Sequence, residues 1–473
     1  MAVVLGLHHP ALAALTEDGA LLVCGASEYG SLGVGLPTVP HARGWWEMAL
    51  LGGEPGADTH PFASEPLLAV AMGRMHMAAV TERGGVWVWG LNQFDQLGPI
   101  PVPPDAPRFR HFPVRWDASV CGGAPVVMVA CGDAFTLALT RAGLVWSCGD
   151  ATFGKTGQAA QVPPEALTRV LGLERIKMVV ASDRASLAVA QDGRLWSWGD
   201  SSVCPLAGVA PGDDRDNRTP HVPRALELSA FGGSRVLFAA AGVFHAAAVT
   251  EAGGLWTWGH DRSGCLGLGR MDPAHRLRRA PTRVGTGGAF AGAPVLMAAC
   301  GYDHTVVLAD GGAVWTCGSG VSNALGHVPT VPCFEPTRVP QASFGDRRVV
   351  CVAAGLDASM AVTAEGVLHA WGAGALGHGG PDGSARIRVP TAVAATLPPG
   401  ARVARTSAIA PGHSLAFMSG TFGRLGVERC EYHLVPTDVL KLIVRSDPAP
   451  GGAYARMGEG LLRLLAVRLR AAP

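Results

Sequence analysis

The sequence predicts an all-β protein, a seven-bladed β-propeller of four-stranded antiparallel blades. Short apolar runs bounded by glycine turns are typical of small antiparallel sheets. The same order of runs recurs seven times at intervals of about 50 to 65 residues, which is typical of propellers and arrays. Each copy closes on a Trp-Gly or Cys-Gly pair: Cys24-Gly25, Trp89-Gly90, Cys148-Gly149, Trp198-Gly199, Trp258-Gly259, Cys317-Gly318 and Trp371-Gly372.

The fifth copy shows how one unit is built. A run of small apolar residues, 239–242, ends in glycine, and a second run, 245–250, begins with a histidine. A turn leads to a third run, 255–258, in which Trp256 and Trp258 occupy alternate positions. A Pro-x-x-Val segment at 281–284 marks a fourth strand, as it does at 336–339 and 390–393. We therefore expect four strands per copy.

These residues suit radial packing. A small sheet is marginally stable alone and must bury both faces against its neighbours, which a closed ring of blades allows. Small side chains fit the crowded inner strands, and tryptophans fill the wider space between blades. We assign structural roles to the repeat histidines His9, His76, His245, His304 and His413, to Trp89, Trp198, Trp258 and Trp371, and to Gly25, Gly90, Gly149, Gly199, Gly259, Gly318 and Gly372.

The order Gly-x-x-His, then Trp-x-Trp-Gly, then a Leu-Gly turn resembles the regulator of chromosome condensation repeat family. The Leu-Gly turn recurs at residues 32–33, 97–98, 266–267, 325–326 and 376–377, and copy four is degraded, with Ser182 and Ala185 in the Gly and His places. The resemblance covers roughly residues 1–420 and implies a seven-bladed propeller. We assign residues 1–420 to this propeller and 421–473 to a C-terminal helical appendage.

The count of strands leaves a question open. The first two strands of a copy recur at residues 402–417, so one such pair is surplus, and the sequence does not say which pair closes the ring. Farther on, Thr437 is suited to cap a helix, and residues 460–470 predict a short amphipathic helix. A helical appendage packed on the propeller is the favoured interpretation, with the start of an F-box as its alternative.

Composition argues against several protein classes. Of the 473 residues 48% are hydrophobic and 16% charged, and the net charge of +1 gives no general attraction to nucleic acid or membranes. The 11 cysteines include no C-x-x-C pair and are expected to be buried thiols in a reducing compartment. We expect no signal peptide and no membrane span, hence a soluble intracellular protein, cytoplasmic or nuclear and not secreted.

No catalytic motif is apparent, and we predict no cofactor and no metal site. Equivalent histidines on different blades stand too far apart to share one metal ion, so we expect them to form structural hydrogen bonds within blades. The chain carries no H-E-x-x-H, P-loop or G-x-S-x-G motif. Enzymatic activity is therefore not expected, apart from the exchange activity that the resemblance implies.

Three insertions hold candidate partner-binding residues. Residues 37–66 contain Trp45 and Trp46, which form either an exposed aromatic anchor or buried indoles under a folded-back loop. Residues 99–116 interleave basic and aromatic side chains, a pattern that suits phosphate contact and stacking. The candidates there are Arg108, Arg110, Arg115 and Trp116.

The third insertion, residues 270–283, is the densest positive cluster. Guanidinium forks suit carboxylates or phosphates. Its candidates are Arg270, Arg276, Arg278, Arg279 and Arg283. For each insertion the alternative is an ordinary solvated surface.

The sequence favours a non-enzymatic interaction scaffold that binds a protein through loops on the propeller faces. The family resemblance implies an alternative, guanine-nucleotide exchange on a small Ras-like GTPase. The founding member of that family acts through a wedge inserted from one blade, and no insertion of this chain can be matched to that wedge. A second alternative is chromatin or nucleic-acid binding through the arginine-rich loops. We expect a monomer whose partner is a protein.

Overall fold

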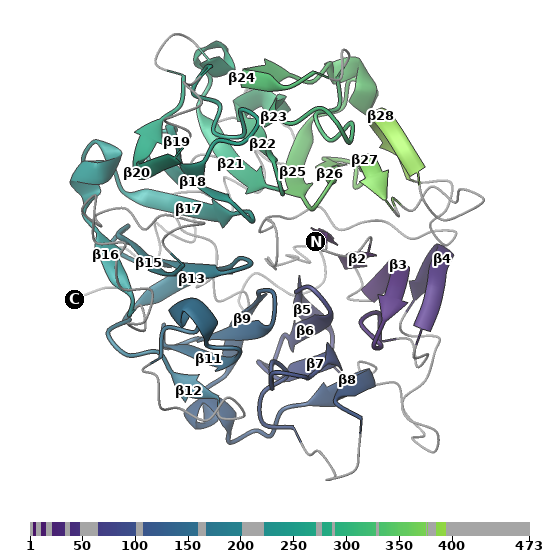
Figure 1. The fold of residues 1–473 in the computed structure, drawn as a ribbon, viewed down its shortest axis with the longest axis vertical. Helices are drawn as coiled ribbons and strands as arrows, with labels where there is room; N and C mark the ends of the chain where they lie inside the picture. The colour runs from purple at the N-terminus through teal and green to yellow at the C-terminus, as the bar shows by residue number, and fades with distance from the viewer. Residues whose placement is uncertain are drawn as a thin grey trace, which may run out of the picture.

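The computed structural model describes residues 3–5, 11–15, 21–33, 38–47, 65–100, 107–158, 167–200, 222–270, 277–285, 289–327, 331–374, 376 and 385–393. These residues form seven four-stranded antiparallel sheets, each built from four consecutive strands. We number the sheets 1 to 7 in chain order and call each a blade. The predicted propeller of four-stranded antiparallel blades is confirmed (Figure 1).

Each blade has an inner first strand and an outer fourth strand. The first strands are β1 (Val3–Leu5), β5 (Leu67–Met72), β9 (Val126–Cys131), β13 (Ile176–Ala181), β17 (Val236–Ala241), β21 (Val295–Cys300) and β25 (Val349–Ala354). The second strands are β2 (Ala11–Leu15), β6 (His76–Thr81), β10 (Phe135–Thr140), β14 (Ala185–Ala190), β18 (His245–Thr250), β22 (His304–Ala309) and β26 (Ala358–Thr363).

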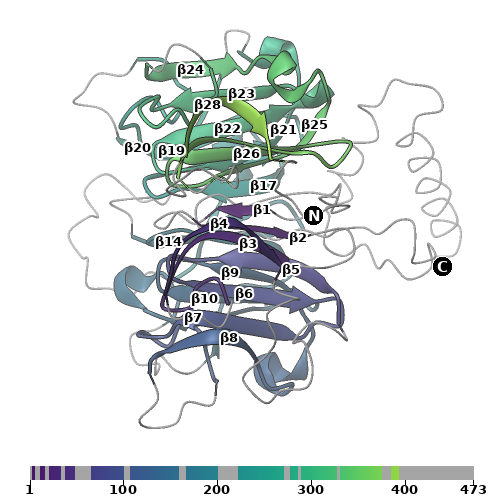
Figure 2. The same cartoon turned by 90° about the vertical axis from the view of Figure 1, so that its right-hand side faces the viewer.

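The remaining strands complete each sheet toward the rim. The third strands are β3 (Leu21–Glu28), β7 (Val86–Leu91), β11 (Val145–Gly149), β15 (Leu195–Gly199), β19 (Leu255–His260), β23 (Val314–Gly318) and β27 (Leu368–Gly374). The fourth strands are β4 (Thr38–Glu47), β8 (Phe109–Arg115), β12 (Thr168–Arg169), β16 (Arg224–Leu226), β20 (Leu277–Arg283), β24 (Cys333–Arg338) and β28 (Ala385–Ala392). Figure 2 shows three of these outer strands, β28, β4 and β8, following one another along the rim.

The first strands of neighbouring blades contact one another all the way round the centre. In particular, β1 contacts both β5 and β25, so blade 1 lies between blades 2 and 7. All four strands of blade 1 come from the N-terminal part of the chain. The surplus strand pair at 402–417 and the predicted appendage at 421–473 lie outside the described residues.

Inner strands are built from small side chains, as the sequence predicts. In β17 every residue is buried, and the last three positions are the small residues Ala239, Ala240 and Ala241. Farther out, the third-strand tryptophans Trp89, Trp198, Trp258 and Trp371 are all completely buried. The assigned structural role of these four tryptophans is consistent with this burial.

Short 3-10 turns add aromatic packing that the sequence did not suggest. They are η2 (Val120–Gly123), η3 (Thr152–Gly154), η5 (Leu228–Phe231), η7 (Ala289–Gly292), η8 (Asp310–Gly312) and η9 (Gln341–Phe344). Phe231 of η5 meets the Trp256 ring edge-on at 5.8 Å, and Phe344 of η9 meets the Trp371 ring at 6.0 Å. No helix within the described part of the chain is long and apolar enough to cross a membrane.

The antiparallel order gives the ring two different faces. One face, which we call the loop face, carries the loops that join first to second strands and third to fourth strands. The opposite hairpin face carries the tight turns between second and third strands and the connections between blades. For example, the turn residue Gly143 contacts the connection at Arg175 and Ile176.

The glycine after each Trp or Cys explains how the two loops of a blade meet on the loop face. Gly90 has φ +96°, and a Cβ there would collide with the carbonyl oxygen of Met75. Without a side chain, the strand passes close enough for the amide of Leu91 to donate to that oxygen at 2.8 Å. The outer loop is thereby attached to the inner loop of its own blade.

Candidate protein-binding face

The repeat histidines connect neighbouring blades. Each repeat histidine that the structure describes places its Nε2 within hydrogen-bonding distance of a hydroxyl in the second strand of the next blade. That hydroxyl in turn donates to a backbone carbonyl in the loop between the third and fourth strands of the histidine's own blade. The sets are His76, Thr136 and Gln96 at 3.0 and 2.7 Å; His245, Thr305 and Cys265 at 2.7 and 2.7 Å; and His304, Ser359 and Ala324 at 2.9 and 2.7 Å. We call this arrangement the inter-blade network.

Our expectation of hydrogen bonds within blades was therefore wrong, although the structural role holds for these three histidines. His9 and His413 lie outside the described residues. The next blade supplies the hydroxyl because the side chain at the head of a second strand points sideways, across the gap between sheets. The sequence signal was present: a Ser or Thr follows the histidine position in several copies, such as Thr136, Thr305 and Ser359.

The network fixes the protonation of the histidines. A hydroxyl has one proton, and Thr305 donates it to the carbonyl of Cys265, so it must accept from an Nε2–H of His245. The other ring nitrogen, Nδ1, is buried and has no partner among the described residues, so a second proton there is disfavoured and the ring is neutral. Burial lowers the pKa of His76 and His245 to about 3 and that of His304 to about 4.

In several copies the closing Trp or Cys reaches the loop carbonyl that also accepts from the hydroxyl of the second strand. Trp198 Nε1 donates to Lys155 O at 2.9 Å, and Trp371 Nε1 donates to Ala324 O at 2.8 Å. Where cysteine replaces tryptophan, the thiol takes that place: Cys317 Sγ lies 3.6 Å from Cys265 O. Cys148 and Cys317 are free and buried, which confirms their reading as buried thiols.

At the interface of blades 3 and 4 a phenylalanine, a buried lysine and an aspartate replace the histidine contact. Phe135 occupies the histidine position, and Lys155 Nζ lies 5.6 Å from its ring centroid. Lys155 is only 3% exposed and forms an ion pair with Asp150 at 2.7 Å. Burial opposes ionisation of Asp150, but hydrogen bonds from Lys155 and Thr152 outweigh it and hold the pKa of that carboxyl below its usual value.

These bonds tie the outer loops of one blade to the strands of the next. The loop face is therefore a rigid platform, and its chemistry depends on the side chains that no bond of this network uses. The position directly before the histidine site varies from blade to blade and points to this face: Met75, Ala134, Arg184, Phe244, Asp303 and Asp357.

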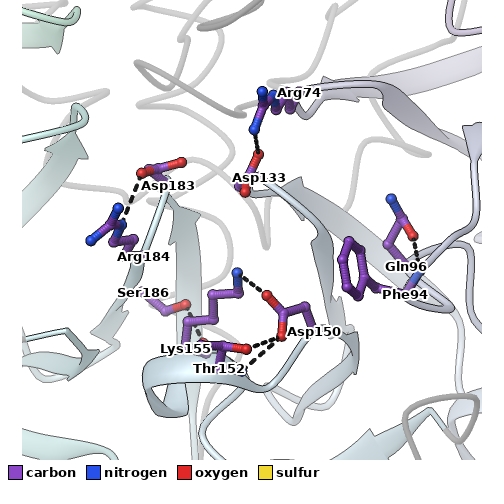
Figure 3. Close-up of polar contacts among 10 residues, drawn as sticks. All are labelled: Arg74, Phe94, Gln96, Asp133, Asp150, Thr152, Lys155, Asp183, Arg184 and Ser186. Atoms are coloured by element: carbon purple, nitrogen blue, oxygen red, sulfur yellow. Dashed lines mark hydrogen bonds and ion pairs between the residues drawn. The ribbon is translucent and has the colours of Figure 1, made fainter. Parts of the chain in front are cut away.

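On blades 2 to 4 the carboxylates of the loop face are paired (Figure 3). Arg74 Nη1 lies 3.5 Å from Asp133 Oδ1. Arg184 lies 3.4 Å from Asp183 and 3.5 Å from the buried carboxylate of Asp200. Each of these carboxylates therefore has a cationic partner, although Asp183 and Asp200 share the single guanidinium of Arg184.

Blades 5 to 7 present a different surface. A cavity of about 490 Å³ opens there, and Tyr302, Asp303, Ser322 and Asp357 contribute to its wall. Neither carboxylate has an ion-pair partner within 4 Å among the described residues. Burial raises the pKa of Asp303; the Arg262 guanidinium opposes that shift and the Asp357 carboxylate reinforces it.

Residues 47–418 match the family model of the RCC1-like domain. The chain belongs to the RCC1-like domain family. The resemblance inferred from the repeat is thus confirmed.

Several proteins of known name are similar to this RCC1-like chain. The ultraviolet-B receptor UVR8 of Arabidopsis thaliana is 31% identical over 313 residues, which are 65% of this chain and 65% of the receptor. The mouse secretion-regulating guanine nucleotide exchange factor is 28% identical over 313 residues, 64% of this chain and 51% of that protein. The human ubiquitin-protein ligase HERC2 is 31% identical, over 6% of its length. The chain therefore spans less than two thirds of each relative.

Solved structures share the propeller. Human WBSCR16 has a TM-score of 0.62 at 26% identity, covering 77% of this chain and 87% of that one. Yeast RCC1 (Prp20) bound to Kap60 has a TM-score of 0.69 at 20% identity, covering 91% and 93%. At that identity the second likeness shows the fold alone.

In this RCC1-like propeller, the predicted loop at 99–116 is in part an outer strand, because residues 109–115 pair with β7 as β8. Arg108 lies 3.6 Å from Asp95, and Arg115 lies 3.2 Å from Glu65. Arg110 donates to two nearby backbone carbonyls. All three arginines therefore lie toward the rim with local partners, and their role in partner binding stays a prediction.

The prediction that Trp116 binds a partner was wrong. Trp116 is 4% exposed, and its Nε1 donates to Leu97 O at 2.7 Å. The indole packs under the Leu-Gly turn and is not available to a partner. Arg115, the preceding residue at the end of β8, is exposed. The basic and aromatic residues that the sequence suggested as one binding strip therefore lie partly on the surface and partly in the core.

The predicted arginine loop at 270–283 also contains an outer strand, β20, which pairs with β19. Arg278 and Arg279 are half-buried and Arg283 is exposed. Arg270 is exposed, with its guanidinium 5.0 Å from the Phe334 ring centroid. Arg276 lies outside the described residues. The rim of the RCC1-like propeller, and not a face loop, therefore carries most of this cluster.

The Trp45-Trp46 pair was likewise placed in a loop, and that expectation was wrong for residues 38–47. These residues form β4, in which Trp46 stands opposite Val23 of β3. The backbone of the pair belongs to the outer strand of blade 1, and the description does not extend to its side chains.

The acidic pocket of the loop face was not predicted from the sequence. Asp303 and Asp357 stand one residue before the second strand of consecutive blades, a position that the repeat leaves free. Since the surrounding Gly, His and Leu-Gly positions are fixed by packing, comparison of the copies at this one position would have pointed to the pair.

Proposed function

We propose that this protein is a non-enzymatic interaction scaffold whose loop face binds a protein partner, chiefly over blades 5 to 7. The inter-blade network holds the loops without using the side chains that face outward. Unpaired carboxylates and an exposed Val321, 73% accessible, occur together beside the cavity. This combination of a rigid base, an open cavity and unused charge is the observation that supports the proposal.

Site-specific photocrosslinking tests it. A photoreactive amino acid replaces Val321 on the loop face or, as a matched control, Leu171, which is 74% exposed in a connection on the hairpin face. Lysine crosslinkers would not report on this face through Lys155 or Lys177, because both are buried. After irradiation in native lysate, position 321 is expected to yield a discrete crosslinked protein that position 171 does not.

Equal products from both positions, or products from position 171 alone, would contradict the proposal. The full chain is used throughout, because each blade depends on its neighbours for burial. We also expect a monomer in the cytoplasm or nucleus. Size-exclusion chromatography with light scattering and imaging of a tagged chain check these two predictions.

A second candidate function is guanine-nucleotide exchange on a small GTPase. The similarity to the secretion-regulating guanine nucleotide exchange factors of mouse and cattle supports it. Exchange needs a surface that destabilises the bound nucleotide and its magnesium, and needs no catalytic residue of the hydrolytic kind. Release of a fluorescent guanine nucleotide from a panel of GTPases is the measurement, and unchanged release across the panel would argue against it.

A third candidate is chromatin or nucleic-acid binding through the rim. Here the supporting observation is the arginine content of β20, where Arg283 is exposed. Phosphate contacts make the logarithm of affinity fall with the logarithm of salt concentration. Arg283→Gln is expected to reduce that slope by about one unit, whereas Arg194→Gln, whose guanidinium pairs with Asp192 on the hairpin face, is not. A slope near zero for the wild-type chain would exclude this function.

A further inference from the structure

Within the loop face, the cavity between blades 5, 6 and 7 contains an unusual carboxylate. Asp303 Oδ1 is buried and accepts no hydrogen bond among the described residues. Burying an ionised carboxylate without a partner is costly, and proteins normally pair such groups. Asp133, Asp150, Asp183 and Asp200 on blades 2 to 4 all follow that rule. Asp303 is the exception.

A second carboxylate shares the cavity. Asp357 holds the position in blade 7 that Asp303 holds in blade 6, and Ser322 Oγ donates to its Oδ1 at 2.6 Å. The serine orients this carboxylate but leaves its negative charge uncompensated. Two like charges therefore face one cavity, which favours a cation there.

The walls of the cavity favour a planar cation. The Tyr302 ring lines it and packs edge-on against Phe244 at 4.9 Å. The outer face of Phe244 already carries the Arg262 guanidinium at 4.4 Å from its ring centroid. The surface thus stacks one arginine of its own beside the cavity, and guanidinium groups combine such stacking with forked hydrogen bonds to carboxylates.

A metal ion is a poorer candidate. Metal sites in proteins collect several oxygen, nitrogen or sulfur ligands around one point. Among the described residues no group of three or more His, Cys, Asp or Glu side chains is placed to do this. A volume of about 490 Å³ is also within the range of pockets that receive organic groups.

We propose that this cavity is a receptor for an arginine side chain of the protein partner, with Asp303 and Asp357 binding the guanidinium and Tyr302 stacking on it. This inference rests on the proposed function and names the partner's chemistry at the same face. The bound guanidinium supplies the hydrogen bond that Asp303 Oδ1 lacks and balances the negative charge that Asp357 adds to the cavity.

The test uses the full chain and small probes. Nα-acetyl-arginine N-methylamide is titrated by saturation-transfer NMR, beside its citrulline analogue, which has nearly the same shape without the charge, and its lysine analogue. We expect the arginine probe to bind, the lysine probe to bind more weakly and the citrulline probe not to bind. Asp303→Asn and Asp357→Asn are each expected to raise the Kd for the arginine probe about tenfold or more.

Asp133→Asn is the matched control, because it removes a carboxylate of the same face that already has Arg74 as its partner. Its affinity for the probe is expected to be unchanged. The thermal midpoint of Asp303→Asn serves as the folding control and is expected to be at or above that of the wild type, since the substitution removes a half-buried charge whose Oδ1 accepts no hydrogen bond among the described residues.

Equal binding of the arginine and citrulline probes would overturn the proposal, as would unchanged affinity in both pocket variants. Stronger binding of the lysine probe would also overturn the assignment to arginine. None of these results depends on the photocrosslinks at position 321. The arginine-receptor proposal can therefore be contradicted while the proposed binding to the loop face is supported, and the reverse.

Discussion

The hydroxyl proton of Thr305 determines the direction of two hydrogen bonds, one to Cys265 O and one from His245 Nε2. It is donated to Cys265 O at 2.7 Å, so the His245 ring at 2.7 Å must be the donor on the other side. The same arrangement recurs at Thr136 and Ser359. Single residues of this kind determine how firmly one blade is attached to the next.

Removing that hydroxyl is expected to destabilise the fold. Thr305→Val keeps the shape of the side chain but leaves the His245 imidazole N–H unpaired and the Cys265 carbonyl with only the weak donor Cys317 Sγ, at a cost of about 2 kcal/mol. The control is Thr282→Val on the outer strand β20, where the hydroxyl only reaches a nearby carbonyl at 3.2 Å. Urea unfolding followed by tryptophan fluorescence makes the comparison. Equal losses in both variants would contradict the structural role of the network.

The buried histidines predict a loss of stability in acid. The pKa of His245 is about 3 in the folded chain and about 6.5 when exposed, so the unfolded chain binds the proton more readily. The contribution of His245 to stability is therefore complete above pH 6.5 and is lost as the pH falls toward 3. Thermal midpoints of the wild type are expected to drop over this window.

His245→Gln is expected to make that pH dependence shallower, because a glutamine amide donates to Thr305 without titrating. The comparison is between the slopes of thermal midpoint against pH, so any constant loss of stability in the variant cancels. Parallel slopes for the variant and the wild type would show that His245 is not among the groups responsible.

Thiol reactivity should separate one cysteine from the others. Burial raises the pKa of Cys121 and Cys131 to about 12, whereas Cys333 is only half-buried. Since the thiolate is the reactive form, iodoacetamide is expected to label Cys333 first among the described cysteines of the native chain. Peptide mass spectrometry reads the order, and early labelling of Cys131 would contradict the placement of β9 in the core.

At the scale of strands, the position of a strand in the blade determines how large a side chain can be accommodated. Ala240 in the inner strand β17 is completely buried, whereas Ala280 in the outer strand β20 is exposed. Ala240→Leu is expected to cost about 1 to 3 kcal/mol by overpacking the centre, and Ala280→Leu should change stability by less than about 0.5 kcal/mol. Unfolding midpoints compare them. Tolerance of leucine at position 240 would contradict a crowded centre.

The strands that the sequence predicts well are those with a strong repeat. The small residues of β17, the histidine that begins β18 and the buried Trp258 of β19 were all placed from pattern alone, because burial on both faces constrains each residue. The outer strands were predicted poorly. Residues 109–115 were taken for a loop, and within 277–283 only the Pro-x-x-Val segment that begins at residue 281 was marked as strand, since a strand with one neighbour and a solvated side carries little hydrophobic pattern.

The candidate site could be predicted only in part. That binding would involve face loops followed from the fold class, but the residues chosen were clusters in the sequence, such as Arg278 and Arg279. The pocket of Asp303 and Asp357 joins residues from two blades, 54 positions apart, so no local pattern reveals it. Burial of Trp116 was missed for a similar reason, because its partner Leu97 belongs to another part of the blade.

For the whole molecule, the ring separates stability from recognition. The first strands contact one another around the centre, and the inter-blade network fixes the loops above them. The loop face is therefore asymmetric by its side chains alone: paired charges lie on blades 2 to 4, and unpaired carboxylates lie on blades 6 and 7. A partner should approach blades 5 to 7.

Hydrogen–deuterium exchange of the full chain, alone and with the partner captured by crosslinking, tests this claim most directly. The account predicts slower exchange on binding in the loops at residues 301–304, 319–324 and 355–358, with little change in β8 and β20. Slower exchange confined to the rim strands β8 and β20, or to the turns of the hairpin face, would contradict it.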